Sequence, residues 1–287
     1  MSSIASRLFS VANRTVLITG GGRGIGSMLA QGYYEAGANV IVTSRTEDSL
    51  KETMDTILKN SPSQSMEVTP SLSYVVSDVS TREGCEKLAS DIGPLLPDGR
   101  LDVLINNAGN AWGEPLERES GKMNWGWDKV LDLNLKGVFY LSRACLPYMK
   151  QGGETMDRYD PSRIINVGSV VGLMPQDAPT HAYDVSKAGV HHLTKKLSGD
   201  LAPYNITVNA LAPGFVPSRM TEGLKSYTTF DDIAKNTPLQ RLGDGDDMTG
   251  ACIYLSSRAG SYVTGVILNV DGGTIGASKI PLSFEED

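Results

Sequence analysis

The chain is poor in cysteine, and its three cysteines among 287 residues are Cys85, Cys145 and Cys252. Their number is odd, their positions are far apart and no Cys-x-x-Cys spacing occurs, which argues against a disulfide framework and a cysteine-rich zinc site. Reduced thiols are typical of the cytoplasm, so we expect a cytoplasmic protein. No His-x-x-x-His pair or carboxylate cluster suggests a metal ion, and we expect no metal cofactor.

Long apolar runs and basic clusters are also missing. No run of about 18 apolar residues occurs and the mean hydropathy is −0.17, so we expect no membrane span. The formal net charge is −7, from 26 basic and 33 acidic residues, and no Lys- or Arg-rich run indicates a nucleic-acid partner. The first 13 residues hold one arginine and no long apolar core, so we expect no secretory signal there.

The chain does contain a repeated alternation of short apolar runs and longer amphipathic segments. The apolar runs predict strands at 15–19, 39–43, 72–77, 101–105, 163–167, 206–210 and 265–270. Helices are predicted between them at 24–36, 46–59, 81–92, 125–150, 181–202 and 244–257. Several runs are apolar at nearly every position, as in strands that are covered on both faces. We therefore predict an α/β fold with a Rossmann-type, doubly wound parallel sheet of about seven strands flanked by helices.

The domain organisation follows from the absence of any clear linker. We interpret residues 1–287 as a single domain with its core at about 11–273. The polar segments 60–71 and 151–162 indicate surface insertions. Residues 213–243 are rich in Pro, Gly, Ser and Thr, and we expect a flexible loop that covers the substrate.

A glycine-rich turn joins the first predicted strand to the first predicted helix. Its sequence is Thr19-Gly-Gly-Gly-Arg-Gly-Ile-Gly26, with glycines at 20, 24 and 26 rather than the Gly-x-Gly-x-x-Gly spacing. Glycine lets the backbone approach a diphosphate closely, and the helix N-terminus offers free N–H groups and a positive dipole end. A tight turn that only packs the helix on the strand is the alternative. The position in the first β-α-β unit favours nucleotide binding.

The end of the second predicted strand indicates which dinucleotide is bound. An acidic residue there accepts from the ribose 2′-hydroxyl, whereas a basic residue accommodates a 2′-phosphate. Here the strand ends Ser44-Arg45, and the first carboxylate is Glu47. Arg23 in the turn is a second guanidinium that could pair with a phosphate. We predict NADP(H) rather than NAD(H), the alternative being that Arg45 is only a solvated charge at a helix start.

Tyr183 and Lys187 are four residues apart in a predicted helix and so share one face. A tyrosine with its usual pKa of about 10 is a poor acid–base group near neutrality. An ammonium about 5 Å away would lower that pKa by about 2 units at an effective dielectric of about 20. Tyr183 could then give a proton to a carbonyl oxygen that receives hydride, or take one from an alcohol. A surface tyrosine that packs on a lysine stem is the alternative.

Two further polar residues lie at informative places. Ser169 follows the fifth strand at its C-terminal end, where open α/β sheets bind ligands, and could hydrogen-bond the substrate oxygen. Asn134 lies inside a long predicted helix, where asparagine is not favoured. A satisfied core amide is the alternative for Asn134. Asn106-Asn-Ala-Gly109 follows the fourth strand and would form the floor of the cofactor site.

Taken together, these residues resemble the short-chain dehydrogenase/reductase family, in its compact single-domain branch. The shared motifs are Thr19-x-Gly-x3-Gly-x-Gly26, Asn106-Asn-Ala-Gly109, Asn134, Ser169, Tyr183-x3-Lys187 and Pro213-Gly214. They occur in the order and spacing of the family, over about residues 11–273. Within the family, the chain looks most like 3-oxoacyl-type reductases, including the type linked to rhamnolipid synthesis.

The resemblance implies a role for each of these residues. Tyr183 is the implied acid/base, and Lys187 lowers its pKa and holds the nicotinamide ribose. Ser169 positions the substrate oxygen, and Asn134 anchors a water in a proton relay. The implied cofactor-binding residues are Gly20, Arg23, Gly24, Ile25, Gly26, Ser44, Arg45, Asp78, Val79, Asn107, Ala108, Gly109, Tyr183, Lys187, Pro213, Gly214, Val216 and Ser218.

The chain departs from the family pattern at two positions. Ser218 stands where threonine is usual, which keeps the hydroxyl. Gly22 stands where NADP-preferring members often have serine, and we expect a slightly weaker phosphate contact as a result.

The sequence therefore favours an NADPH-dependent reductase of a ketone or 3-oxoacyl-type substrate. An NAD(P)-dependent alcohol, polyol or sugar dehydrogenase is the first alternative, and a catalytically silent protein that senses the dinucleotide is the second. We expect an apolar substrate pocket lined by Trp112, Val170, Met174, His181, Phe215 and Met220. The resemblance also implies a homo-oligomer, a tetramer or a dimer, with residues 125–150 and 181–202 at the interface.

Overall fold

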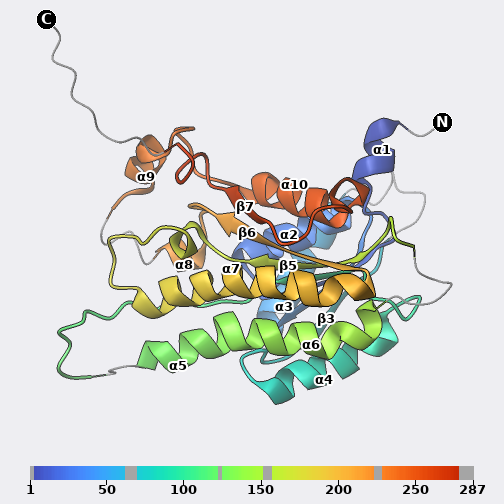
Figure 1. Cartoon of the computed structure of the whole chain (residues 1–287), viewed down its shortest axis with the longest axis horizontal. Helices are drawn as coiled ribbons and strands as arrows, with labels where there is room; N and C mark the ends of the chain where they lie inside the picture. The colour runs from blue at the N-terminus through green and yellow to red at the C-terminus, as the bar shows by residue number, and fades with distance from the viewer. Residues whose placement is uncertain (1–2, 62–69, 122–124, 151–156, 223–227, 278–287) are drawn as a thin grey trace, which may run out of the picture.

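A parallel sheet of seven strands forms the centre of the molecule, in the order β3-β2-β1-β4-β5-β6-β7 (Figure 1). The structure is a computed structural model that describes residues 3–61, 70–121, 125–150, 157–222 and 228–277. The strands are β1 (Thr15–Thr19), β2 (Asn39–Ser44), β3 (Leu72–Val76), β4 (Val103–Asn106), β5 (Ser162–Val167), β6 (Ile206–Pro213) and β7 (Ile267–Val270). The α-helices are α1 (Ile4–Phe9), α2 (Gly24–Glu35), α3 (Glu47–Asn60), α4 (Arg82–Ile92), α5 (Trp125–Leu131), α6 (Gly137–Met149), α7 (His181–Leu201), α8 (Arg219–Glu222), α9 (Phe230–Asn236) and α10 (Gly245–Ser256).

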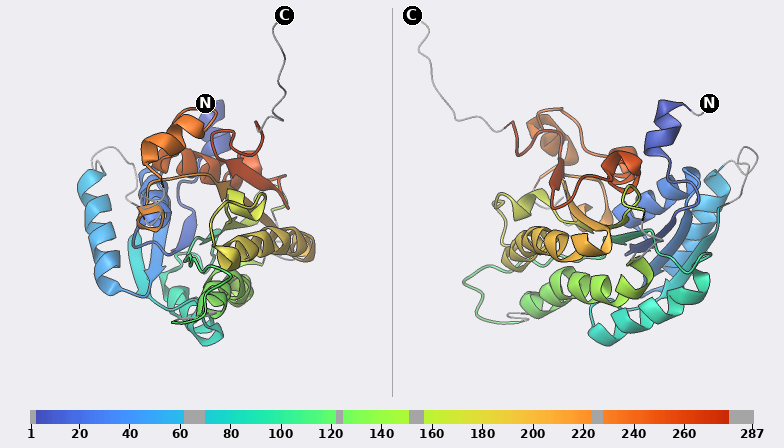
Figure 2. Two further views of the ribbon diagram at one scale, coloured as in Figure 1. Left: turned by 90° about the vertical axis from the view of Figure 1, so that its left-hand side faces the viewer. Right: turned by 45° about the vertical axis from the view of Figure 1, so that its right-hand side comes forward.

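Helices cover both faces of the sheet because the strands are apolar on both faces. In β1, Val16 and Ile18 belong to the core beneath α2, α3 and α10, whereas Leu17 points to the opposite core beneath α4, α6 and α7. All three side chains are fully buried. Figure 2 shows α4 and α6 together on the side of the sheet opposite α10. The predicted doubly wound, Rossmann-type sheet is confirmed.

The structure differs from the sequence prediction in several local features. Three short helices, α1, α8 and α9, were not predicted. The predicted helix over 125–150 is interrupted by a π-helical turn, η2 (Asp132–Lys136), between α5 and α6. Of the two expected surface insertions, residues 62–69 and 151–156 lie outside the described residues.

The segment after β6 contains more regular structure than its composition suggests. β6 continues through Pro213, and α8 and α9 lie within the expected loop over 213–243. Residues 223–227 of this loop lie outside the described residues. In the described part of the chain, no helix combines the length and the apolar character that a membrane crossing requires.

A buried charge network holds the sheet at the end opposite the C-terminal strand ends. Arg163 is the second residue of β5 and is completely buried, and one of its guanidinium nitrogens lies 2.7 Å from the Asp160 carboxylate. Arg14 donates to the same carboxylate oxygen at 2.7 Å, and Arg163 also donates to the carbonyl of Ser257. Partial burial alone would raise the pKa of Asp160, but the two guanidiniums lower it below its ordinary value.

Replacing Asp160 by asparagine should lower the free energy of unfolding by about 2–4 kcal/mol, because the buried Arg163 charge loses its carboxylate partner. The contribution of Asp160 is present above the ordinary carboxyl pKa of about 4 and is lost as the pH falls below it, so the difference between the two proteins should shrink in acid. Urea denaturation at neutral and acid pH measures both effects.

The matched control is Asp200→Asn. Asp200 pairs with Lys196 on an exposed helix face, where such pairs contribute less than about 1 kcal/mol. Equal losses of stability from the two substitutions at neutral pH would contradict the assignment of Asp160.

Candidate active site

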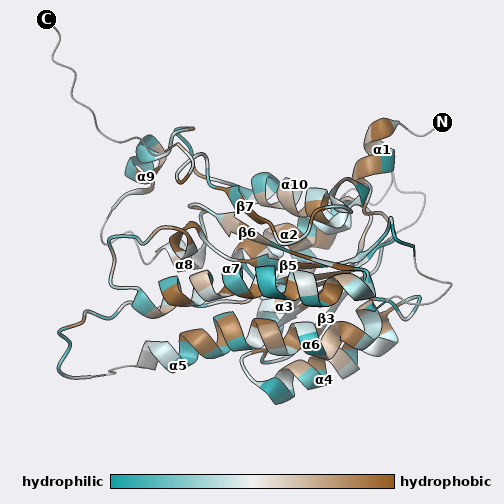
Figure 3. Ribbon diagram, viewed as in Figure 1, coloured by the Kyte–Doolittle hydropathy of each residue, from teal (hydrophilic) through white to brown (hydrophobic). Residues whose placement is uncertain are grey.

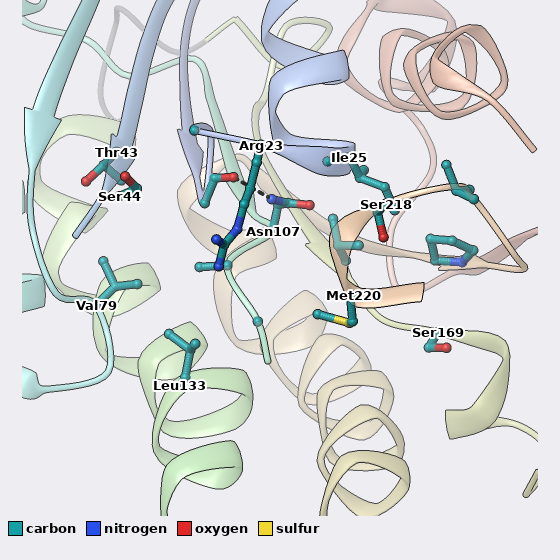
Figure 4. Close-up of a pocket in the computed structure, with 18 of the residues that line it drawn as sticks. Arg23, Ile25, Thr43, Ser44, Val79, Asn107, Leu133, Ser169, Ser218 and Met220 are labelled. Atoms are coloured by element: carbon teal, nitrogen blue, oxygen red, sulfur yellow. Dashed lines mark hydrogen bonds between the residues drawn. The ribbon is translucent and has the colours of Figure 1, made fainter. Parts of the chain in front are cut away.

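A cleft of about 400 Å³ opens at the C-terminal ends of the strands. It lies where the strand order reverses, because β1 pairs with β2 on one side and with β4 on the other. The loops that follow β1 and β4 therefore diverge toward opposite faces of the sheet, which leaves a crevice between them. Figure 4 shows Thr43 and Ser44 at one end of this cleft and Ser169 and Met220 toward the other.

The glycine-rich turn forms one wall of the cleft, and its glycines are required by geometry. Gly20 and Gly24 have φ of 66° and 57°, in the left-handed region that favours glycine. A Cβ on Gly26 would lie 2.3 Å from the carbonyl oxygen of Gly20, so no other residue fits there. α2 begins at Gly24 and its N-cap, Arg23, makes no side-chain cap. The first N–H groups of α2 are thus available to an anion.

The turn is attached to the segment after β4 through Thr19. Its hydroxyl oxygen accepts from the backbone N–H groups of Asn107 and Ala108, at 3.0 and 2.9 Å. The Asn107 side chain donates to the carbonyl oxygens of Thr19 and Gly20, at 2.8 and 3.4 Å (Figure 4). These bonds fix the two sides of the crevice relative to each other.

One end of the cleft is rich in hydroxyl and guanidinium groups. Arg23, Ser44 and Arg45 line it, and Figure 4 shows Arg23 extending from the turn into the cleft. Glu47 is held elsewhere, because its carboxylate accepts from the Tyr74 hydroxyl at 2.7 Å and pairs with Lys51 at 2.9 Å. This end therefore suits a phosphate group.

Tyr183, Lys187 and Ser169 lie together at the other end. Lys187 Nζ is 5.6 Å from the centroid of the Tyr183 ring and donates to the carbonyl of Val167 at 2.7 Å. Ser169 is the second residue after β5 and hydrogen-bonds the Tyr183 phenol. The structure brings together the phenol, the serine hydroxyl and the ammonium, as the sequence predicted.

The pKa of Tyr183 does not follow the sequence prediction. Burial raises the pKa of Tyr183 above its ordinary value, although the hydrogen bond with Ser169 lowers it. Burial also lowers the pKa of Lys187 to about 8. Burial thus disfavours the charged form of both groups, so the protein groups alone do not make Tyr183 acidic.

Asn134 lies behind the cleft, in the π-helical turn η2. It is 1% exposed, and its side-chain oxygen accepts from the Asn110 backbone N–H at 2.9 Å. Its side-chain nitrogen donates to the Asn110 carbonyl and to the Ser186 hydroxyl, at 2.9 and 3.0 Å. The side chain thereby joins the segment after β4 to α7. Turns of this type frequently occur at functional sites.

Most of the residues that the sequence predicted as cofactor-binding do line the cleft. The exception is Gly26, which lies beneath the turn against Gly20. Asp78 is near Arg45: partial burial would raise its pKa, but hydrogen bonds from Ser80 and the charge of Arg45 lower it. The lining residues that the sequence analysis did not name as site residues are Thr43, Thr46, Ser49, Ser77, Leu133, Val167, Gly168 and Thr221.

The six residues expected to form one apolar pocket do not share one. Met220 lines the main cleft, whereas Trp112 and His181 line a second cavity of about 200 Å³. Val170 is buried and Met174 is 44% exposed. Within the described ranges, no set of three or more His, Cys, Asp or Glu residues is arranged to hold a metal ion.

The chain is similar over most of its length to known reductases and dehydrogenases. A family model described as enoyl-(acyl carrier protein) reductase matches residues 20–274. The rhamnolipids biosynthesis 3-oxoacyl-[acyl-carrier-protein] reductase of Pseudomonas aeruginosa is 36% identical over 92% of this chain and 97% of its own length. Gluconate 5-dehydrogenase of Gluconobacter oxydans is 34% identical over 93% of this chain and 96% of its own.

A solved structure is similar over nearly the whole fold. The Pseudomonas aeruginosa RhlG/NADP active-site complex superposes with a TM-score of 0.82 and is 35% identical, covering 93% of this chain and 98% of the other.

Replacing Ser169 by alanine should raise the pKa of Tyr183, because the hydrogen bond that lowers it is removed. The measurement is a pH titration of the protein with ¹³C at the tyrosine Cζ atoms, followed by NMR. Tyr183→Phe identifies the resonance by its loss. An unchanged or lower pKa in the Ser169→Ala protein would show that the two hydroxyls do not interact.

Proposed function

The chain belongs to the short-chain dehydrogenase/reductase family and is therefore an oxidoreductase, and from this premise we propose that it uses NADPH to reduce a ketone of the 3-oxoacyl type. The observation that carries the proposal is the meeting of two hydroxyls, Ser169 and Tyr183, beside the buried Lys187. Two hydroxyls at one point suit a reacting oxygen atom, and the relatives named for 3-oxoacyl reduction act on such a carbonyl.

The residues of the cleft fit NADP(H). The turn around Gly20 and Gly26 leaves no room for a Cβ, and the free N–H groups of α2 suit the diphosphate. Arg23 and Arg45 suit a 2′-phosphate, and Glu47 is occupied by Tyr74 and Lys51. The RhlG structure, similar over nearly its whole length, is an NADP complex.

The mechanism assigns a task to each residue of the catalytic cluster. NADPH, when bound, would supply the hydride that the carbonyl carbon accepts. Ser169 and Tyr183 hydrogen-bond the carbonyl oxygen, and Tyr183 donates the proton that this oxygen takes up. Lys187 holds the ribose next to the nicotinamide and remains close to the phenol as the phenol loses its proton.

Asn134 acts through the proton supply to this cluster. A Cβ on Gly109 would lie 3.3 Å from Asn134 Oδ1 and 3.7 Å from Lys187 Nζ, so Gly109 leaves space between these two groups. We place the relay water in this space, because it has polar partners on both sides. The loop over 213–243 would cover the substrate, since Ser218 and Met220 already line the cleft.

The first alternative is an NAD(P)-dependent alcohol, polyol or sugar dehydrogenase. It is supported by the relative named gluconate 5-dehydrogenase. The second alternative, a catalytically silent protein that senses the dinucleotide, is less favoured because Tyr183, Lys187 and Ser169 lie together in the cleft and Asn134 directly behind it.

We also propose a cytoplasmic homo-oligomer, a tetramer or a dimer. All three cysteines are buried free thiols, which suits a reducing compartment. Trp127 of α5, Phe139 of α6 and Val185 of α7 are between 39% and 51% exposed. Figure 3 shows hydrophobic turns along these three helices. Residues 125–150 and 181–202 would form the interface.

The proposal is tested by a screen of cofactors and substrates. Turnover with NADPH should exceed turnover with NADH by at least about tenfold, because two guanidiniums are available to the 2′-phosphate. Oxidation of NADPH should be followed with 3-oxoacyl thioesters, simple ketones, sugars and quinones. A preference for NADH, or oxidation of sugars as the main activity, would favour the dehydrogenase alternative instead.

Replacing Tyr183 by phenylalanine should lower kcat by at least about 100-fold, because the proton donor is removed. NADPH affinity, measured by fluorescence titration, should remain within about twofold, since the ring itself is kept. Tyr204→Phe is the matched control, because Tyr204 is exposed and contacts Lys150 outside the cleft. Undiminished turnover of the Tyr183→Phe protein would remove Tyr183 from its proposed role.

A further inference from the structure

Ser49 occupies the place that a side chain at Gly22 would take. A Cβ built on Gly22 would lie 2.5 Å from Ser49 Oγ and 3.3 Å from Ser44 Oγ. Gly22 does not have a positive φ, so its backbone would accept a larger residue. What excludes a side chain at this position is therefore the Ser49 hydroxyl, which reaches across from α3.

The Ser49 hydroxyl belongs to a small polar group at the mouth of the cleft. It donates to the carbonyl of Thr46 at 2.8 Å, and Ser44 Oγ donates to the same carbonyl at 3.0 Å. The two hydroxyl oxygens are 3.3 Å apart. A serine hydroxyl rotates freely and can redirect its proton. The hydroxyls of Ser44 and Ser49 can therefore both donate hydrogen bonds to an acceptor that enters the cleft.

The charges around this pair favour an anion. Ser44, Ser49, Arg23 and Arg45 all line the same cleft. The Glu47 carboxylate accepts from Tyr74 and pairs with Lys51. The Asp78 carboxylate, which lines the same cleft near Arg45, accepts from the hydroxyl and the backbone N–H of Ser80. Two guanidiniums and two hydroxyls thus line one cleft, which is the donor set of a phosphate site.

We propose that Ser49 is a specificity-determining residue that hydrogen-bonds the 2′-phosphate of NADPH, together with Ser44. It supplies from α3 the hydroxyl that the glycine-rich turn lacks at Gly22. This inference rests on the proposed use of NADP(H). On this proposal, the hydroxyl that is missing at Gly22 is provided from a position 27 residues later in the chain.

The experiment separates phosphate recognition from catalysis by using fragments of the cofactor. Calorimetric titration with 2′,5′-ADP and with 5′-AMP compares two ligands that share the adenosine and the 5′-phosphate and differ only in the 2′-phosphate. Four proteins are compared with the wild type: Ser49→Ala, Gly22→Ser, the Gly22→Ser/Ser49→Ala double variant and Thr56→Ala.

The Ser49→Ala protein should bind 2′,5′-ADP about 5- to 20-fold more weakly, since a hydrogen bond to a charged group is lost. Its affinity for 5′-AMP should change by less than about twofold. The double variant should recover 2′,5′-ADP affinity to within about threefold of the wild type, because the new hydroxyl enters the space vacated at Ser49. Gly22→Ser alone should give no gain, because its side chain meets Ser49.

Thr56→Ala is the matched control. Thr56 is exposed on the same helix, and its hydroxyl likewise bonds a carbonyl of that helix, at 2.8 Å. Removal of this hydroxyl should leave the affinities for 2′,5′-ADP and for 5′-AMP within about twofold of the wild type.

The outcomes distinguish failure of the proposed use of NADP(H) from failure of the proposed role of Ser49. A wild type that binds 2′,5′-ADP no more tightly than 5′-AMP would overturn the proposed use of NADP(H), and the role of Ser49 with it. If the Ser49→Ala protein prefers 2′,5′-ADP over 5′-AMP by the same factor as the wild type does, only the role of Ser49 would be overturned. Failure of the double variant to recover affinity, in a protein whose thermal unfolding is unchanged, would also overturn it.

Discussion

The bonds that Thr19 makes to the segment after β4 determine where the whole site can be. β1 and β4 are neighbours in the sheet, but the helices that follow them cover opposite faces, so nothing in the sheet itself holds their loops together. The Thr19 hydroxyl accepts from both Asn107 and Ala108, and it is 2% exposed. A hydroxyl this deeply buried is well ordered, and the glycine-rich turn is fixed as a result.

The catalytic cluster illustrates why proximity alone does not set a pKa. Tyr183 and Lys187 have the separation that their spacing on a helix predicts. Both are removed from water, and desolvation disfavours the charged form of each. The protein thus holds the two side chains close together, but their burial opposes the lowering of the Tyr183 pKa that a nearby ammonium would otherwise cause. By the proposed mechanism, the charge balance is completed only with the dinucleotide in place.

The sequence predicted those features that depend on neighbours along the chain. The strands were found because β-branched, apolar runs in a parallel sheet are buried on both faces, and Tyr183 and Lys187 because a helix places them on one face. The π-helical turn at Asn134 was not predictable in this way. Its backbone hydrogen bonds span five residues rather than the four of an α-helix. It accompanies the bonds of Asn134 to Asn110 and Ser186, which come from other segments.

Ser49 shows the same limit on the cofactor side. Its contact with Gly22 exists because α3 packs against the turn after β1, and no local pattern records that packing. The pocket expected from six apolar residues was divided between two cavities for a similar reason. Trp112 and His181 lie next to catalytic motifs in the sequence, but their side chains face a different cavity from Met220.

The cleft is lined by residues from Gly20 to Thr221, so it is complete only after both halves of the sheet have assembled. A dinucleotide that spans it would bind the native state and not a partly folded chain, and mass action would then stabilise the native state by about 2.7 kcal/mol at 100 times its Kd. The lifetime of the protein in the cell would then depend on the supply of the dinucleotide, in whichever oxidation state binds, as well as on its own sequence. Proteolysis would deplete such a protein when the dinucleotide is scarce and spare it when the dinucleotide is abundant.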